Sequence, residues 1–260
     1  MHKIFIDNDK IIESDINYFY KEKKDTFEIS ELNITIDKDM ELLLNINMVE
    51  SKLIINFNIS DKIVVDLIII TNGCKSKIQY KYSLNTKSKL NVQKLNIVDG
   101  IREMIIANLD QSSSFNYIFK SIASSKENYD YMIYHNGIDS NSNIINNCVN
   151  ENGSIYMQIS SFIPKDITGC CANQYNRIIN NTDNICEIRP NLYIDCDEVE
   201  ANHSALIDKF NNNELFYLET KGINYEDSFK LLMRGFLVSK ITNKDIINII
   251  NKRYGGEYFE

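Results

Sequence analysis

Two residues of types that can bind iron or zinc, Cys186 and His203, lie near the end of the strand-rich part of the sequence. A thiolate together with an imidazole suits iron, zinc or an iron–sulfur cluster. If their separation of about 17 residues approximates one coil of a β-solenoid, the two side chains would stack on adjacent rungs about 5 Å apart. On this spacing they form a candidate metal or cluster site; the other reading of His203 is a structural residue bonded to the following helix.

Other signatures of catalysis are absent from the sequence. It contains no GxSxG, P-loop, GxGxxG or HExxH motif. The six cysteines are scattered without a CxxC pair, so we expect reduced thiols rather than a disulfide framework. The compact acidic candidates are Asp195, Asp197 and Glu198. The sequence therefore carries no classical catalytic signature.

A period of two in the apolar residues organises the chain from about residue 28 to about 200. Alternation of this kind, rich in β-branched and aromatic residues, is typical of strands with one buried face. Many short strands without intervening helices predict a barrel, a sandwich or a β-helix. Nine glycines and two prolines supply tight turns poorly, and we expect the pairs Asn146–Asn147 and Asn180–Asn181 at turns instead. The alternating runs are residues 32–36, 53–59, 78–82, 115–119, 129–133 and 155–159.

After residue 205 the pattern becomes helical. A first helix is expected over 211–220, with Gly222 just beyond its end. Asn224 and Thr242 are expected to cap two further helices, each with an aspartate three residues later. The sequence thus predicts three parts: an N-terminal segment at 1–27, a β core at 28–205 and a C-terminal helical segment at 206–260.

Charge and hydropathy exclude several classes of function. The formal net charge is −8 and no stretch carries a basic block, which argues against nucleic acid as a partner. The longest apolar runs are only a few residues long, so no membrane-spanning segment is expected. No signal peptide is visible at the start, and we expect a cytoplasmic protein.

Several ordered motifs resemble those of the SufB/SufD family. Residues 189–205 carry its succession of Pro190, Leu192, Ile194, Val199 and His203. Residues 214–218, 221–223 and 231–237 resemble the family's C-terminal tail, and residues 135–137 and 174–177 resemble two of its turns. The resemblance covers roughly residues 110 to 240.

The resemblance implies a fold and a set of partners. It implies an all-β fold, a right-handed parallel β-helix with a small C-terminal helical segment. Members act as scaffolds in iron–sulfur cluster assembly, hold a cluster transiently and are not enzymes in their own right. They bind a SufC-type ATPase through the C-terminal helices, and they pair with a second SufB/SufD-type subunit or with themselves.

The resemblance also implies roles for individual residues. His203 falls on the family's histidine, and Ser204 after it is small, as in SufD-like members. The cluster cysteine of SufB-like members corresponds to Asn184, two residues from Cys186, so Cys186 is the candidate second ligand. We expect exposed groups of the helical segment to bind the ATPase; the candidates are Phe216, Tyr217, Ile223, Arg234, Ile246 and Ile250.

A second class of function stays open at this point. A β-solenoid can also bind or cleave glycans, which would require acidic residues clustered along one strand face. The candidates for that role are Asp195, Asp197 and Glu198, which coincide with the family motif.

Overall fold

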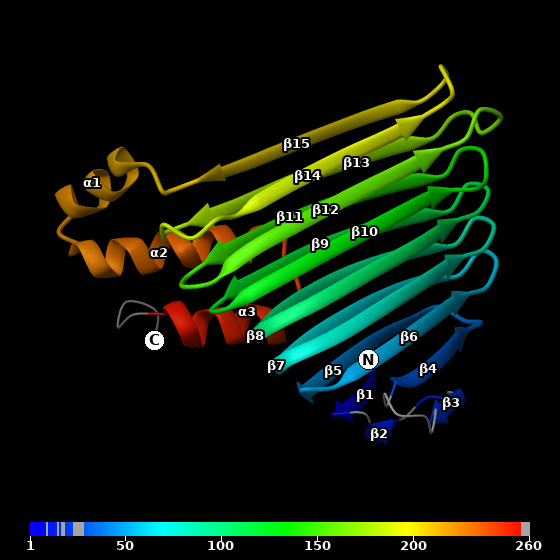
Figure 1. Ribbon diagram of the computed structural model, residues 1–260, viewed down its shortest axis with the longest axis horizontal. Coiled ribbons are helices and arrows are strands. Elements are labelled where there is room, and N and C mark those ends of the chain that lie inside the picture. The colour runs from blue at the N-terminus through cyan, green and yellow to red at the C-terminus, as the bar shows by residue number, and fades with distance from the viewer. Residues whose placement is uncertain (9, 15, 17–18, 23–28, 256–260) are drawn as a thin grey trace.

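The strands wind into one parallel β-solenoid of about seven turns (Figure 1). The computed structural model describes residues 1–255, except 9, 15, 17–18 and 23–28. All 15 described strands belong to a single sheet. The parallel β-helix expected from the sequence is therefore confirmed.

The solenoid has two broad faces that run along its axis. We call them the helix-covered face and the opposite face. The helix-covered face contains β5 (Met40–Val49), the first halves of β7 (Val64–Leu84) and β8 (Lys89–Leu109), β9 (Ser114–Ala123), β11 (Asn141–Asn150), β13 (Cys171–Asn180) and β15 (Glu200–Asp208). The opposite face contains β4 (Ile29–Ile36), β6 (Lys52–Ile59), the second halves of β7 and β8, β10 (Lys126–His135), β12 (Ser154–Ile163) and β14 (Glu187–Ile194).

The N-terminal segment contributes strands to the same sheet. β1 (His2–Asp7) pairs in parallel with β5 and antiparallel with β2 (Lys10–Ser14). β3 (Phe19–Glu22) pairs antiparallel with β4. Strands therefore begin at residue 2 rather than near residue 28; the expected boundary at 27 and 28 itself lies outside the described residues.

The register shows that the turns of the solenoid differ in length. One early turn runs from Val65 to its partner Leu90, and a longer, later one runs from Asn141 to its partner Cys171. β7 and β8 pass from one face to the other without a break, bending at Gly73 and Gly100, where φ is positive. A Cβ at Gly73 would lie 1.7 Å from the Met48 carbonyl oxygen, so only glycine fits this corner.

Apolar and aromatic side chains fill most of the interior. Phe57, Tyr82, Phe115 and Tyr117 form a continuous row of rings, with neighbouring centroids 5.4 to 5.7 Å apart. Asn146 also points inward and its amide donates to Asn176 Oδ1 at 2.7 Å. The expectation that Asn146 marks a turn is therefore wrong, because it lies within β11 and its side-chain nitrogen bonds to the next turn of the solenoid inside the interior.

Three helices follow the last strand: α1 (Asn212–Thr220), α2 (Tyr225–Val238) and α3 (Lys244–Tyr254). The side chain of Asn224 caps α2 by accepting from the Asp227 amide, as expected. Asn243, not Thr242, caps α3, because its side chain accepts from two amides of the first turn. None of these helices combines the length and apolarity needed to span a membrane; this holds for the described residues.

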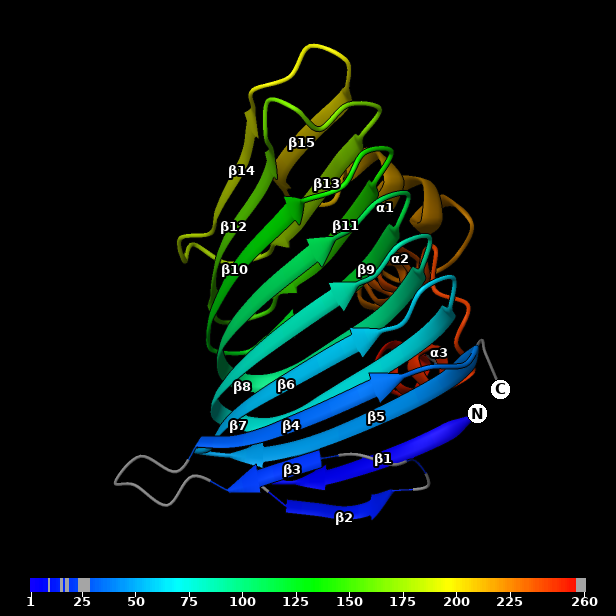
Figure 2. The same ribbon diagram turned by 90° about the vertical axis from the view of Figure 1, so that its right-hand side faces the viewer.

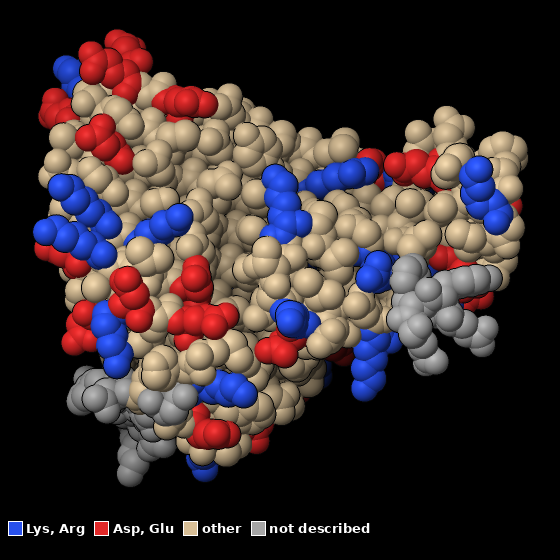
Figure 3. Space-filling model, turned by 180° about the vertical axis from the view of Figure 1, so that it is seen from behind, with Lys and Arg blue, Asp and Glu red and all other residues tan. Residues whose placement is uncertain are grey.

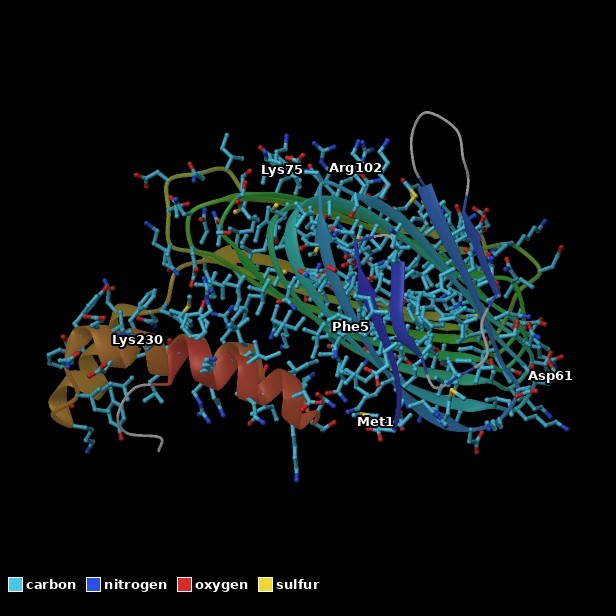
Figure 4. All side chains as sticks on the ribbon, turned by 90° about the horizontal axis from the view of Figure 1, so that it is seen from below. Met1, Phe5, Asp61, Lys75, Arg102 and Lys230 are labelled. Carbon is cyan, nitrogen blue, oxygen red and sulfur yellow. The ribbon has the colours of Figure 1, made fainter. Side chains whose placement is uncertain are left out.

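The helices lie against the helix-covered face and not over an end of the solenoid (Figures 2 and 4). Ile246 and Ile250 are fully buried, and Tyr254 nearly so, against a row of outward-facing apolar residues of this face. That row includes Leu43, Ile68, Ile70, Leu95, Ile122, Val149 and Ile179. The expectation that Ile246 and Ile250 are exposed is therefore wrong, since the sheet offers a matching apolar surface.

Candidate functional site

The last turn of the solenoid, made by β14 and β15, forms an open end. β14 pairs only with β12, and β15 pairs only with β13, within the described part of the chain. Both strands therefore present an unpaired backbone edge, which is a template for pairing with another chain. Figure 2 shows this end at the top, with the helices to one side of it.

His203 lies on this open end. It pairs with Gln174 of the turn beneath, and Gln174 is fully buried in the interior. Because paired residues of parallel strands point the same way, the His203 side chain faces the interior side of the last turn. No described turn covers it, and it is exposed. The imidazole in this place is accessible to a metal ion.

The side-chain amide of Gln174, which is buried beneath His203, forms hydrogen bonds through its nitrogen only. Gln174 Nε2 donates to Ser161 Oγ at 2.8 Å and to the Asn191 carbonyl oxygen at 3.2 Å. Gln174 Oε1 is buried without a hydrogen-bond partner among the described residues. A free acceptor directly under an exposed imidazole is available to a proton donor that enters from the open end.

The rest of the open end is largely apolar. The inward-pointing residues of β14 pair with inward-pointing residues of β12. None of these β14 residues is fully buried. Ile207, inward-pointing on β15, is 40% exposed, and Leu206 beside it is 49% exposed. We define the end face as Ile188, Pro190, Leu192, Ile194, Ala201, His203, Ala205 and Ile207. An uncovered apolar surface of this kind marks an interaction site.

Cys186 lies on the same turn but far from His203. It immediately precedes β14 and is half-buried, and Asn150 Nδ2 lies 3.4 Å from its sulfur. Burial raises the pKa of its thiol. The hydrogen bonds of Gln174 place His203 opposite Leu192, six residues from Cys186, or about 20 Å along the strand.

The expected stacking of Cys186 and His203 on adjacent rungs is therefore wrong. One turn is as long as the stretch from Val65 to Leu90 or from Asn141 to Cys171, and both are longer than the stretch between Cys186 and His203. The two residues accordingly belong to the same turn and to opposite faces, and within one chain they cannot share a metal ion. Among the described residues, no group of three or more His, Cys, Asp or Glu side chains could hold one.

The residues of the helical segment that were expected to bind the ATPase differ in their exposure to solvent. Phe216 and Tyr217 on α1 are 67% and 60% exposed. Ile223 is exposed to an intermediate degree, and so is Arg234, whose Nε donates to Asn251 Oδ1 at 2.7 Å. With Ile246 and Ile250 buried, the large exposed apolar side chains of the described helices are Phe216 and Tyr217 on α1 and Tyr225 at the start of α2.

His135 has a structural environment. The ring is fully buried, with Nδ1 2.9 Å from Ser140 Oγ and Nε2 3.0 Å from Ser142 Oγ. Burial lowers its pKa to about 4, so the ring is neutral near pH 7. Both nitrogens are occupied, which leaves none for a metal.

The interior also holds a buried polar cluster that the sequence reasoning missed. Lys94 Nζ lies 2.5 Å from Glu103 Oε2, and both side chains are completely buried. Asn96 links Glu103 to Tyr129, with nitrogen–oxygen distances of 3.0 and 3.3 Å. Lys94 and Glu103 both occupy inward positions of β8, in phase with apolar neighbours. That break in the period-two pattern is the signal that could have found them.

Glu127 extends this cluster towards the open end. Its Oε2 accepts from Ser121 Oγ and from Tyr129 Oη. Burial raises the pKa of Glu127 to about 8, so its carboxyl is protonated at neutral pH. Lys94 has a pKa lowered by burial to about 8 and stays charged at pH 7. The cluster therefore combines an ion pair with a neutral acid.

Replacing Glu127 by glutamine is expected to change how stability depends on pH. The folded protein keeps the Glu127 proton up to about pH 8, whereas the unfolded chain releases it above the ordinary pKa of 4.5. The wild-type protein therefore loses stability as the pH rises through this window, by up to about 1.4 kcal/mol per pH unit. Glutamine has no such proton. The unfolding free energy of Glu127→Gln should therefore rise relative to that of the wild type between pH 5 and pH 8.

Urea unfolding of both proteins at pH 5, 6, 7 and 8 measures the effect. Titration of all other groups is common to the two proteins and cancels in the difference. A difference in unfolding free energy that stays constant across this range would mean that Glu127 is ionised in the folded state.

These observations define a class of protein: a parallel β-solenoid with a helical flank and an open, largely apolar end. Residues 80–236 match the family model described as SUF system FeS cluster assembly, SufBD core domain. The match covers more than half of the chain, which therefore belongs to the SufBD family.

Two curated relatives are similar to parts of this chain. An iron–sulfur cluster assembly SufBD family protein of Mycobacterium leprae is 37% identical over 84 residues, which are 30% of this chain and 21% of the relative. The chloroplastic protein ABCI7 of Arabidopsis thaliana is 34% identical over 62 residues, which are 23% of this chain and 13% of the relative. The matched segments thus span about a fifth or less of each relative.

The acidic residues of the glycan alternative lie in a turn. Asp195, Asp197 and Glu198 are exposed between β14 and β15 and do not line a strand face. Figure 3 shows acidic side chains gathered at the upper left, where this turn lies when the molecule is seen from behind. Their placement, together with the family, favours the assembly reading over glycan processing.

Proposed function

We propose that this protein is a scaffold subunit for iron–sulfur cluster assembly, not itself an enzyme, that works with a SufC-type ATPase in the cytoplasm. The observation that carries the proposal is the SufBD core match over residues 80–236. All six cysteines are free, which is compatible with a reducing compartment. The cluster is cargo, held transiently and passed on.

The open end is the proposed place of a second SufB/SufD-type subunit, either another chain of this protein or a related one. Two unpaired strand edges and the apolar end face would be covered by such a partner. His203 lies among these residues and would face the partner. Since a cluster generally takes four ligands, the partner would supply most of them.

Cys186 is proposed as a second ligand only in combination with His203 of the other chain. It lies at the far end of the same turn, so it could join His203 only across the interface, from the other chain. Across a twofold axis, Cys186 of one subunit can lie near His203 of its partner and the reverse, which allows such a pair.

The proposed ATPase contact is α1 with the turn that follows it. Phe216 and Tyr217 form an exposed aromatic pair there, Ile223 lies in the turn that follows, and Arg234 lies on α2. Exposed aromatic residues and arginine are enriched where protein partners bind.

Anaerobic reconstitution with iron and sulfide tests the proposal, with the ATPase and the second subunit present. His203→Ala is expected to abolish the cluster absorbance of the complex while the melting temperature changes little, because His203 is exposed. Ser204→Ala is the matched control: it is the next residue of the strand, is also exposed, and points to the other side.

Two outcomes would count against the role of His203. Full absorbance in His203→Ala would show that it is not a ligand. A large loss of stability with the absorbance intact would show that it is a structural residue. Absence of any absorbance in the wild-type complex would count against cluster assembly itself.

A further inference from the structure

A row of cations crosses the face of the solenoid that carries no helices. Lys52, Lys77 and Arg102 pair with one another on successive turns. Their side chains all point outward, because their strand neighbours Leu53, Ile78 and Glu103 are buried. Figure 4 shows Arg102 projecting from the side away from the helices, close to Lys75.

Two members of this row, Lys77 and Arg102, have no acidic partner in the part of the chain that the structure describes. Lys75 nearby is bound to Glu50 at 3.2 Å. Lys77 and Arg102 are exposed and form no ion pair with any described residue. Strand spacing brings their backbones about 4.8 Å apart. Like charges on directly paired residues destabilise a sheet, and the cost is recovered when an anion binds between them.

The row borders a hollow of a size that holds a small molecule. A hollow of about 490 Å³ is lined by Arg102 together with Lys126, Asn128 and Tyr156 of the next two turns. A second one of about 220 Å³ adjoins it and is lined by Lys52, Lys77 and Arg102. Arg102 belongs to both, so it lies at their junction. Ligand pockets are commonly about 300 to 1,000 Å³.

The charges in this hollow are separated along its length. Lys126 Nζ lies 5.3 Å from the centre of the Tyr156 ring, which holds a third cation at the Arg102 end. At the other end, the charge of Glu187 is matched by Arg189, at 2.5 Å. Glu103 contributes to the wall, but its carboxylate is turned inward and bound to Lys94. Asp130 is the remaining carboxylate, two residues along β10 from Asn128.

We propose that this hollow binds a phosphate-bearing small molecule, with the phosphate held between Lys77, Arg102 and Lys126. The planar guanidinium of Arg102 matches two phosphate oxygens, and the two ammonium groups add charge on either side of it. Asn128, Tyr156 and Gln158 would then contact the organic part. The site is separate from the open end and from α1, and it does not depend on the proposed function.

Calorimetric titration of the full chain with pyrophosphate and with ADP, at fixed ionic strength, tests this site. Arg102→Glu and Lys77→Glu are each expected to weaken binding at least about ten-fold, since a lost charged hydrogen bond is worth about 1.5–3 kcal/mol. Lys81→Glu is the matched control. It makes the same charge change on the same strand and face, about 13 Å from Lys77 and outside both hollows.

Tighter binding of ADP than of pyrophosphate would show that the site also recognises the organic part of the ligand. Equal binding of the two would show that it recognises only the phosphate. Either result supports the site if Lys81→Glu binds normally. Equal weakening by all three variants would mean diffuse attraction and would overturn the proposal. So would no binding of either probe at millimolar concentration, or binding of polyglutamate in their place, which would indicate an acidic protein partner.

Discussion

With Lys94 replaced by methionine, the free energy of unfolding at pH 7 is expected to fall by about 3–5 kcal/mol. Lys94 and Glu103 form an ion pair with no exposed surface, and Lys94 Nζ also lies 3.9 Å from the Tyr80 ring centre. Methionine fills similar space but leaves the Glu103 carboxylate buried without its cation. The cost of an unpaired buried charge exceeds that of the lost packing.

A second substitution separates the charge from the packing. Lys94→Met combined with Glu103→Gln should recover at least half of the loss, because the neutral amide can still accept from Asn96. Lys81→Met, on the exposed side of β7, is the control and should change stability by less than about 0.5 kcal/mol. Urea unfolding measures all three variants. If the double variant is no more stable than Lys94→Met alone, the loss comes from packing and not from charge.

Deletion of residues 242–260 is expected to destabilise the whole solenoid, by about 5 kcal/mol or more. The deletion removes Ile246, Ile250 and Tyr254, which are 0%, 0% and 6% exposed. Each such side chain contributes about 1.5–3 kcal/mol on burial. It also removes the hydrogen bond from Tyr254 Oη to Glu151 Oε1, at 2.5 Å, and exposes the apolar row beneath α3.

Thermal unfolding and the soluble fraction after expression measure this effect. A chain that ends at Gly255, and so keeps α3 whole, is the matched control. An unchanged melting temperature of the 242–260 deletion would show that α3 is not needed by the sheet.

This expected loss of stability decides how the ATPase contact should be tested. A truncation would confuse lost binding with lost folding, whereas Phe216→Ser and Tyr217→Ser change exposed residues only. Ile12, 62% exposed on β2 at the other end of the solenoid, provides an equivalent control as Ile12→Ser. Binding of the ATPase to all of these variants alike would place its contact elsewhere.

The sequence by itself determined the type of most elements. Period-two alternation identified the strands, because a half-buried strand places successive side chains on opposite sides. The helix caps were also local: Asn224 accepts from the Asp227 amide only three residues away, and Gly222 takes the positive φ of 88° expected after a helix. The family motifs in turn indicated a solenoid, which alternation alone left open beside a barrel or a sandwich.

The tertiary structure decided which residues meet. The length of a turn varies along the chain: the stretch between Asn141 and Cys171 is longer than the stretch between Val65 and Leu90. It depends on corners and loops that have no period of their own. For this reason the spacing of Cys186 and His203 was misread.

The buried ion pair of Lys94 with Glu103 was not foreseen either. It reaches across the interior between the two halves of β8, which lie on different faces of the solenoid. Only the bend at Gly100 brings the two halves opposite each other.

The tertiary structure also decided which surfaces are buried and which are exposed. A helix pattern shows that one side is apolar but not what covers it, so Ile246 and Ile250 were assigned to a partner although they pack on the sheet. Conversely, nothing local distinguishes the strand of His203 from any other strand. Only its position as the last strand, with no described strand beyond it, exposes a side chain that would otherwise lie in the interior. Local interactions determine the element, whereas burial depends on neighbours that are distant in the chain.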